Sequence, residues 1–463
     1  MKIEQIINSC LSEITYFIQD SDQAIVIDPL RNPDPYIDMA NNIGAEIKYV
    51  FLTHFHADFV SGHIDLAEKT GATIVCGPGA LADFDFYEAK DEEIFNVGNI
   101  SLKLLHTPGH TLESSSYLLL DENNKEHSLF TGDCIFIGDV GRPDLAVIPG
   151  NTDLEDLAEM LYFSIHNKIL SLPDDIIIYP NHSKGSACGK NIEPETFDTL
   201  KNQIKTNYAL NPNLSKHKFI ELITEGLNDP PVYFKYDAIL NKQIIPSFND
   251  VLSKANKTIN TDKFLELAAN KDYLVVDTRS KLDFLQYGTI KNAIFIGNDG
   301  DFCNSVGNLI DDINQKIICI IDDNTDFTEI ITKFAWMGYD NIIGYLEGGF
   351  SSLSELNFII EKTKYISDLQ FKDLISTDEN INILDVRKQS DYEDFHIDKA
   401  TNISIENFLS ESHRLDQDFT YYIYCNSGYR SLIITTLLKK NGFNDVINVS
   451  AALEDIKKTL SKI

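Results

Sequence analysis

The chain has 463 residues, of which 43% are hydrophobic and 24% are charged, as in ordinary globular proteins. Its 39 basic and 71 acidic residues give a formal charge of −32, which argues against nucleic acid or an anionic membrane as a partner. No apolar run approaches the roughly 18 residues of a membrane span. At about 150 residues per domain, this length predicts three domains.

The cysteines indicate a reducing compartment. There are seven, an odd number, and none forms a Cys-x-x-Cys pair, which argues against a disulfide framework or a structural zinc. The stretch from Met1 to Cys10 lacks the apolar core of a secretion signal. We therefore expect a cytoplasmic protein.

The first part of the chain alternates predicted strands and helices. One strand is expected to end at Asp28, and two more are expected at 49–52 and 73–76. Helices are expected between these strands, at 35–43 and 62–70. Strand, helix and strand with tight Gly and Pro punctuation predict an α/β fold.

Four of the predicted strands end on side chains that can bind metal. The strand 49–52 leads into Thr-His-Phe-His-Ala-Asp-Phe at 53–59, and three later strands end near Thr-Pro-Gly-His-Thr at 107–111, Thr-Gly-Asp at 131–133 and Pro-Asn-His at 180–182. Loops at one rim of a sheet can assemble a metal site in this way. The alternative is a set of polar loops with surface histidines. The candidate residues are His54, His56, Asp58, His110, Asp133 and His182, whereas His63, His106 and His127 receive no role.

These motifs, together with Asp28, stand in the order and spacing of the metallo-β-lactamase fold, which the first 240 or so residues resemble. Members with two zinc ions carry a histidine directly after the aspartate of the first loop, where this chain has Phe59. The sequence therefore resembles the persulfide dioxygenase branch, whose members hold one iron. Gly-Arg-Pro-Asp at 141–144 and Gly-Ser-Ala-Cys-Gly at 185–189 support that comparison.

The resemblance implies one Fe(II) per chain, with His54, His110 and Asp133 as its ligands. Two imidazoles and one carboxylate suit a non-haem iron that activates oxygen. His56, Asp58 and His182 would then orient ligands, water and substrate. The competing interpretation is zinc bound by all of these histidines.

The second part of the chain contains a repeat. Tyr-Leu-Val-Val-Asp-Thr-Arg at 273–279 recurs as Asn-Ile-Leu-Asp-Val-Arg at 382–387, and Met-Gly-Tyr-Asp-Asn at 337–341 recurs as Asn-Gly-Phe-Asn-Asp at 441–445. Repeats this far apart indicate duplicated domains. A polar stretch at 246–261 precedes them, so we expect domains at 1–245, 246–360 and 361–463.

Asp-x-Arg after a strand, the segment 391–397 and Cys-Asn-Ser-Gly-Tyr-Arg-Ser at 425–431 resemble the rhodanese sulfurtransferase domain. Backbone amides, a helix N-terminus and Arg430 would favour the thiolate of Cys425, and a buried inert cysteine is the alternative. Six residues run from Cys425 to Arg430, one fewer than in related phosphatase loops, so the loop resembles the sulfur-transferring type. The active-site loop would comprise Cys425, Asn426, Ser427, Gly428, Tyr429, Arg430 and Ser431.

The first copy differs at its centre. Counting back from Gly338 places Ile321 where the second copy has its cysteine, followed by an acidic loop at 322–326. Cys303 and Cys319 stand elsewhere, so this copy is expected to lack activity. The second copy instead has Ser450-Ala451-Ala452 where rhodaneses have a Gly-Gly turn, which the first copy keeps at 348–349.

The predicted fold is therefore a metallo-β-lactamase αββα sandwich followed by two rhodanese-like α/β domains. The resemblance to persulfide dioxygenase–rhodanese fusions implies oxidation of a small thiol persulfide by O₂ to sulfite, and transfer of sulfane sulfur by Cys425 to sulfite, in sulfide detoxification. It also implies a dimer or tetramer. One alternative is a zinc-dependent, glyoxalase II-like thioester hydrolase with a sulfurtransferase tail, and another is a persulfide-binding regulatory scaffold.

Overall fold

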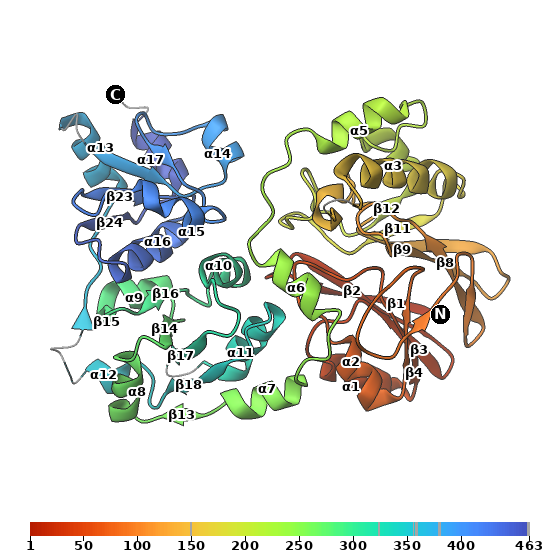
Figure 1. Ribbon diagram of the computed structural model, residues 1–463, viewed down its shortest axis with the longest axis horizontal. Coiled ribbons are helices and arrows are strands. Elements are labelled where there is room, and N and C mark those ends of the chain that lie inside the picture. The colour runs from red at the N-terminus through yellow and green to blue at the C-terminus, as the bar shows by residue number, and fades with distance from the viewer. Residues whose placement is uncertain (149–150, 323–324, 355, 357–359, 378–380, 461–463) are drawn as a thin grey trace. The chain divides into compact units, whose positions relative to one another are not determined.

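The computed structural model of the protein describes residues 1–148, 151–322, 325–354, 356, 360–377 and 381–460. It divides the chain into two units, Met1–Phe248 and Asn249–Ile463. In Figure 1 the N-terminal unit runs from red to yellow-green and the C-terminal unit from green to blue. Each unit is described by itself below.

Two six-stranded sheets form the centre of the N-terminal unit. The first has the order β1 (Lys2–Asn8), β2 (Glu13–Asp20), β3 (Gln23–Ile27), β4 (Glu46–Phe51), β5 (Thr73–Cys76) and β6 (Tyr87–Glu88). The second has the order β12 (Asp198–Thr199), β11 (Ile177–Pro180), β10 (Glu126–Gly132), β9 (Ser115–Leu120), β8 (Ile100–His106) and β7 (Ile94–Val97).

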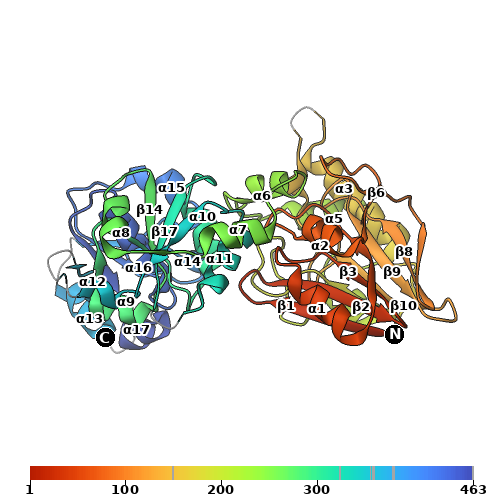
Figure 2. The same cartoon turned by 90° about the horizontal axis from the view of Figure 1, so that it is seen from below.

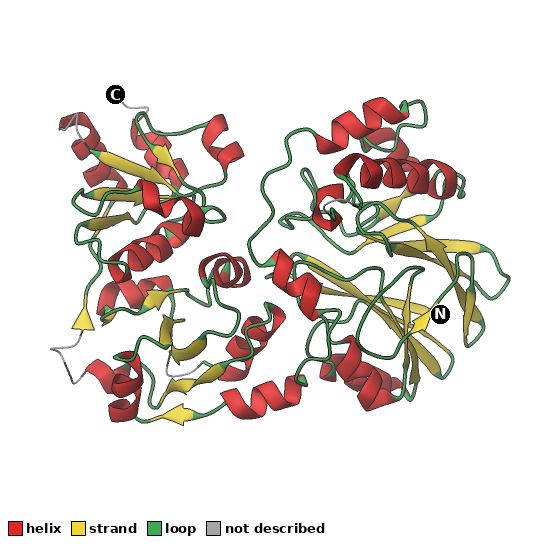
Figure 3. Cartoon of the chain, in the orientation of Figure 1, coloured by secondary structure: helices red, strands yellow, loops and turns green. Residues whose placement is uncertain are grey.

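The side chains of each strand alternate between two hydrophobic layers. In β2, Tyr16 joins the core between the two sheets, whereas its neighbour Phe17 joins the core beneath the helices of the first sheet. Helices α1 (Asp34–Ile43) and α2 (His63–Thr70) cover that outer face, and α3 (Leu154–Ser164), α4 (Leu200–Thr206) and α5 (Lys216–Thr224) cover the outer face of the second sheet. Figure 3 shows the helices in red outside the yellow strands. The predicted αββα sandwich is confirmed.

The strand directions determine where the polar loops meet. Strands β3 and β4 run parallel in one sheet, and β10 and β11 run parallel in the other. Their carboxyl ends carry the loops that begin at Asp28, Leu52, Asp133 and Asn181. These loops therefore gather at one edge of the sandwich.

The stretch 246–261, expected as a polar connection, contains the helix α7 (Phe248–Ala255), which follows α6 (Phe234–Leu240). Phe248, Val251 and Ala255 recur at helical spacing and are buried. Three apolar side chains are thus enough to make a helical stripe in a segment that reads as polar.

The C-terminal unit contains two five-stranded sheets of parallel strands, and both sheets have the same strand order. Figure 2 shows this unit, in green to blue, from a second direction. The first has the order β13 (Thr258–Ile259), β18 (Ile342–Leu346), β17 (Lys316–Ile320), β14 (Tyr273–Asp277) and β16 (Ile294–Phe295). The second has the order β20 (Tyr365–Ile366), β24 (Val446–Val449), β23 (Tyr421–Tyr424), β21 (Asn382–Asp385) and β22 (Thr401–Asn402). The repeat found in the sequence is therefore a repeat of whole folds.

Helices and one small antiparallel pair complete the unit. The helices are α8 (Thr261–Ala268), α9 (Lys281–Tyr287), α10 (Phe302–Leu309), α11 (Phe327–Trp336), α12 (Ser351–Ser354), α13 (Asp368–Thr377), α14 (Gln389–Asp394), α15 (Phe408–Glu411), α16 (Tyr429–Lys440) and α17 (Leu453–Leu460). The pair consists of β15 (Thr289–Ile290) and β19 (Ile360–Glu361).

The repeated Asp-x-Arg motif is a buried ion pair in both copies. Arg279 donates two hydrogen bonds to Asp277, at 2.9 and 2.7 Å, and Arg387 binds Asp385 in the same way. In each copy the arginine also donates to a main-chain carbonyl beyond the next helix, that of Gly288 or Phe395. A planar guanidinium forms such paired bonds with a carboxylate, so the motif fixes the strand to the following segment.

Among the described residues, no helix is long and apolar enough to cross a bilayer.

Candidate functional site

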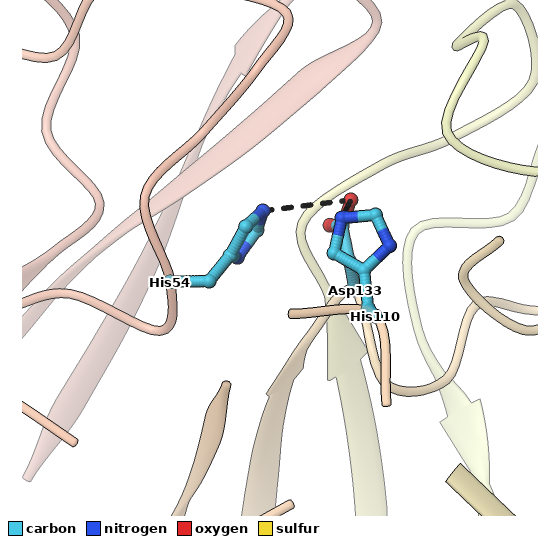
Figure 4. A group of neighbouring side chains, drawn as sticks. All are labelled: His54, His110 and Asp133. Carbon is cyan, nitrogen blue, oxygen red and sulfur yellow. Dashed lines mark ion pairs between the residues drawn. The ribbon is translucent and has the colours of Figure 1, made fainter. Parts of the chain in front are cut away.

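His54, His110 and Asp133 come together at the edge of the sandwich (Figure 4). Asp133 Oδ2 lies 3.3 Å from His110 Nε2 and 3.7 Å from His54 Nε2. All three side chains are buried, and their ligand atoms lie within 4.8 Å of one another. The three loops that follow β4, β8 and β10 thus supply one donor each.

Hydrogen bonding assigns the proton on the His54 ring. The single hydroxyl proton of Thr53 is donated to Asp28 Oδ2 at 2.8 Å. Thr53 Oγ1 must then accept from His54 Nδ1, 2.9 Å away, so that Nε2 keeps its lone pair. Burial and the neighbouring histidines hold the pKa of His54 well below its usual value, which keeps the ring neutral.

The ring of His110 is oriented by the Gly-Arg-Pro-Asp segment. Its Nδ1 lies 2.9 Å from the carbonyl oxygen of Arg142, which can only accept, so Nδ1 carries a proton and Nε2 is the ring nitrogen that faces Asp133. The Arg142 side chain is itself held by two hydrogen bonds to Asp144, at 2.7 and 2.6 Å. Carbonyl groups beside metal-binding histidines commonly fix the tautomer in this way.

The donor atoms fit a cation. His54 Nε2 and both carboxylate oxygens of Asp133 are buried without a hydrogen-bond partner. Buried polar atoms in proteins nearly always have a partner. Two neutral imidazole nitrogens and a carboxylate around these atoms form a set that suits Fe(II), and also zinc.

The other three predicted residues lie beside this group. His182 Nε2 is 3.3 Å from Asp58 Oδ2 and 3.5 Å from Asp133 Oδ1. His56 Nε2 is 3.2 Å from Asp28 Oδ1. Burial alone would lower the pKa of His56, but the carboxylates of Asp28, Asp58 and Asp133 together raise it. The structure therefore brings all six predicted residues together.

Phe59 stands directly after Asp58, at the position where the resemblance leads us to expect a histidine in proteins with two zinc ions. Its side chain is fully buried, and its ring centroid lies 4.5 Å from that of His56. The ring offers no donor atom, which removes one ligand from any second metal position.

Sequence reasoning missed two groups at this site. The thiol of Cys188 lies within 4.8 Å of the ligand atoms of Asp58 and His182, and Glu13 Oε2 is 3.0 Å from His182 Nδ1. Burial, with the nearby carboxylates, raises the pKa of both Cys188 and Glu13. Cys188 stands in the Gly-Ser-Ala-Cys-Gly motif, which could have identified it as a site residue. Glu13 stands in β2, where no motif marks it.

The second candidate site is the loop after β23. Cys425 is fully buried, and its Sγ accepts the main-chain N–H of Ser431 at 3.4 Å. The Ser431 hydroxyl donates a hydrogen bond to Asn448 Oδ1 at 2.7 Å. Its oxygen lies 3.6 Å from Sγ and can accept a hydrogen bond from the thiol. Helix α16 begins at Tyr429, which places Arg430 in its first turn. Gly428, with a φ of 75°, makes the left-handed turn into the helix.

The first copy has no nucleophile at the matching position. Asp277 pairs with Ile320 as Asp385 pairs with Tyr424, so Ile321 follows β17 as Cys425 follows β23. Cys319 lies on β17 and Cys303 on α10, both buried. Of the predicted acidic loop, residues 323–324 lie outside the described residues, and burial raises the pKa of Asp322.

The position of the missing Gly-Gly turn is also resolved. Gly348 and Gly349 of the first copy have φ values of 72° and 58°. The N–H of Ser450 binds the carbonyl of Ile366, and the first copy has the matching bond from Glu347 to Ile259. In the second copy, the N–H of Leu453 also binds the carbonyl of Asn426 at 2.9 Å. The turn after β24 is thereby tied to the Cys425 loop.

Comparisons with known proteins identify both parts of the chain. The model of the metallo-beta-lactamase superfamily matches residues 11–182, and the rhodanese-like domain model matches residues 260–356 and 367–459. Human persulfide dioxygenase ETHE1 is 31% identical over 188 residues, which are 39% of this chain and 68% of that protein. Hydroxyacylglutathione hydrolase of Dictyostelium discoideum is 32% identical over 179 residues, 37% of this chain. This chain spans 63% of the hydrolase's length, less than two thirds.

A solved structure extends the likeness beyond one domain. The metallo-beta-lactamase from Staphylococcus aureus subsp. aureus COL is 31% identical, with a TM-score of 0.64, and the match covers 75% of this chain and 98% of that chain. The relatives are enzymes of the metallo-beta-lactamase and rhodanese families, and their fold and the buried donor set imply a metal. The chain therefore belongs to the metallo-beta-lactamase superfamily, as a fusion of a domain homologous to persulfide dioxygenase with two rhodanese-like domains.

Proposed function

We propose that the N-terminal unit is a persulfide dioxygenase with one Fe(II) per chain, and that the Cys425 domain is a thiosulfate-forming sulfurtransferase. The substrates would be a low-molecular-weight thiol persulfide and O₂, and the pathway would be the detoxification of sulfide in the cytoplasm. The proposal that the N-terminal unit is a dioxygenase rests on the group of His54, His110 and Asp133, together with a phenylalanine at position 59.

Iron held by His54 Nε2, His110 Nε2 and a carboxylate oxygen of Asp133 would supply binding and activation of O₂. The chain's own residues orient both imidazoles so that Nε2 faces Asp133, through Thr53 and the carbonyl of Arg142. Oxidation of the terminal sulfur to sulfite consumes O₂ and one water and releases the free thiol and two protons. His182 faces Asp58 and Asp133 and can accept or return a proton there.

In the second reaction, the Cys425 thiolate attacks the outer sulfur of a thiol persulfide. The sulfur–sulfur bond of that persulfide breaks, its inner sulfur leaves as the free thiol with the proton, and Cys425 is left as the anionic cysteine persulfide. Sulfite then attacks the outer sulfur, which forms the sulfur–sulfur bond of thiosulfate, and the electron pair of the broken bond returns to Cys425. The N–H of Ser431 stabilises negative charge on Sγ at the helix N-terminus. The product of the first reaction is the acceptor of the second, which gives a reason for the fusion.

Metal analysis combined with O₂ uptake tests the dioxygenase. We expect purified protein to hold one iron per chain and to consume O₂ with at least one persulfide among those of glutathione, coenzyme A, cysteine and bacillithiol. His110→Ala should lose both iron and uptake, whereas His127→Ala, a half-buried histidine away from the site, should lose neither. Protein that binds no iron and consumes no O₂ with any of these persulfides would refute the proposal.

A zinc-dependent thioester hydrolase is the second candidate, because hydroxyacylglutathione hydrolase is as similar to this chain as persulfide dioxygenase is. The second donor group of Asp58, His182 and Cys188 could serve a second metal. Zinc-loaded protein that hydrolyses acylglutathione thioesters, with no O₂ uptake by the iron-loaded form, would favour this function.

The resemblance also implies that the protein is a homodimer or homotetramer. Sedimentation velocity tests this oligomeric state.

A further inference from the structure

Two residues of the Cys425 loop are bound by the first rhodanese-like domain, which has Ile321 in place of the active-site cysteine. Lys281, the first residue of α9, donates a hydrogen bond from Nζ to the carbonyl oxygen of Ser427 at 2.8 Å. Tyr429 donates its hydroxyl to the carbonyl oxygen of Gly297 at 2.5 Å. Both contacts lie within the C-terminal unit.

The ring of Tyr429 rests on a glycine of the inactive copy. A Cβ atom at Gly300 would stand 2.3 Å from the Cε2 atom of Tyr429 and 2.4 Å from its Cζ atom, so position 300 leaves no room for a side chain. The ring of Phe295 packs edge-on against the same tyrosine, with centroids 5.7 Å apart. Tyr429 is only 7% exposed, and its position therefore depends on the inactive domain.

The contact of Lys281 has an electrostatic consequence for the loop. In a planar trans peptide the C=O and the next N–H point in opposite directions. The ammonium group on the Ser427 carbonyl therefore directs the N–H of Gly428 away from the inactive domain. A cation at the carbonyl also polarises the peptide and strengthens the hydrogen bonds that its N–H can donate.

The inactive domain also presents a carboxylate to the loop arginine. Asp301 follows Gly300 and precedes α10, which packs against α15 of the active copy. Burial raises the pKa of Asp301, and the charge of Arg430 lowers it, which places the two groups within electrostatic reach. Glu406 and Lys388 of the active copy are further charged neighbours of Asp301.

We propose that the inactive rhodanese-like domain, which lacks the active-site cysteine, is the positioning half of a two-domain sulfurtransferase site. Lys281 and the turn at 297–300 hold Ser427 and Tyr429, and thereby fix the amides that stabilise the anionic persulfide of Cys425 while sulfite, a second anion, approaches. Lys281 is the principal positioning residue. This inference rests on the proposed sulfur transfer by Cys425.

Lys281→Met tests it, in the full-length chain. Thiosulfate formation from a persulfide and sulfite is measured without O₂, so that the metal site does not contribute, and the alkylation of Cys425 by iodoacetamide is followed against pH. We expect kcat to fall about tenfold, the size of one hydrogen bond from a charged donor. The midpoint of the alkylation profile should move to higher pH, because the thiolate loses support.

Three further variants serve as a rescue, a second test and a negative control. Lys281→Arg should restore most of the rate, and Gly300→Ala should lower kcat by displacing Tyr429. Lys271→Met, which removes an exposed lysine of the same domain, should behave as wild type. O₂ uptake should be unchanged in all four variants, which excludes general misfolding.

The outcome separates this inference from the proposed function. If Cys425→Ser abolishes sulfur transfer but Lys281→Met keeps the wild-type kcat and alkylation profile, the positioning role is refuted and sulfur transfer stands. If Cys425→Ser leaves transfer intact, the proposed function fails first.

Discussion

At the scale of single residues, the metal site depends on where two protons lie. Thr53 and the carbonyl of Arg142 each occupy one ring nitrogen of a histidine and leave the other facing Asp133. Neither partner is a titratable group, so the tautomers are fixed by hydrogen-bond geometry. Such partners commonly matter to a metal site nearly as much as its ligands do.

Phe59 is the residue that most restricts the metal content. Phe59→His should raise the zinc content toward two ions per chain after zinc loading, because it adds a donor beside His56 and directly after Asp58, a member of the second donor group. Metal analysis by mass spectrometry measures this, with Phe59→Leu as the control that changes the packing without adding a donor. An unchanged metal content in the histidine variant would mean that position 59 does not control the second metal.

The six site residues could be predicted because each follows a strand, and strands of common direction end at one edge. Glu13 could not be predicted, since its role depends on the loop after β11 lying against β2. Cys188 lies six residues beyond His182, and only the turn between them brings its thiol to Asp58. Contacts across the sheets leave no local pattern in the sequence.

At the scale of elements, the strands that lead into the site loops and helices α1 and α2 could be predicted from the apolar pattern, whereas most other elements and the exact ends could not. Helix α16 begins at Tyr429 because Gly428 supplies the left-handed turn there. Helix α7 was missed because its stripe is short and its other residues are polar. Boundaries set by a cap or a tertiary contact are the part that the sequence pattern alone does not fix.

The end of β2 carries a pH-sensitive contact. Asp20 Oδ2 accepts hydrogen bonds from the N–H of Asn99, at 2.7 Å, and from its side-chain amide, at 3.1 Å. The bond from the Asn99 backbone is the main cause that lowers the pKa of Asp20 from 3.8 to about 2. The stabilisation is therefore present above the unfolded pKa and is lost as the pH falls through the folded one.

Asp20→Asn should thus lower the stability of the N-terminal unit at about pH 5, and the difference from wild type should shrink as the pH approaches about 2. Denaturant unfolding across this range measures the effect. Asp22→Asn is the matched control, because Asp22 is an exposed carboxylate near the same turn. A difference between Asp20→Asn and wild type that does not vary with pH would contradict this explanation.

At the scale of the whole molecule, the chain joins a metal-site unit to a duplicated rhodanese-like unit. The duplication could be predicted because the Asp-x-Arg strand and the glycine turn recur, and both copies use them for the same buried contacts. The loss of the nucleophile in the first copy was also predictable, from Ile321. The contacts of Lys281 and Gly297 with the Cys425 loop were not, because they depend on how the two copies pack.

The products of Cys425→Ser show whether the two proposed reactions proceed in series. Persulfide and O₂ are supplied, O₂ uptake is recorded, and sulfite and thiosulfate are quantified at early times, with Cys10→Ser as the control thiol variant. We predict O₂ uptake equal to wild type, with sulfite accumulating in place of thiosulfate. An unchanged yield of thiosulfate from Cys425→Ser would contradict the account.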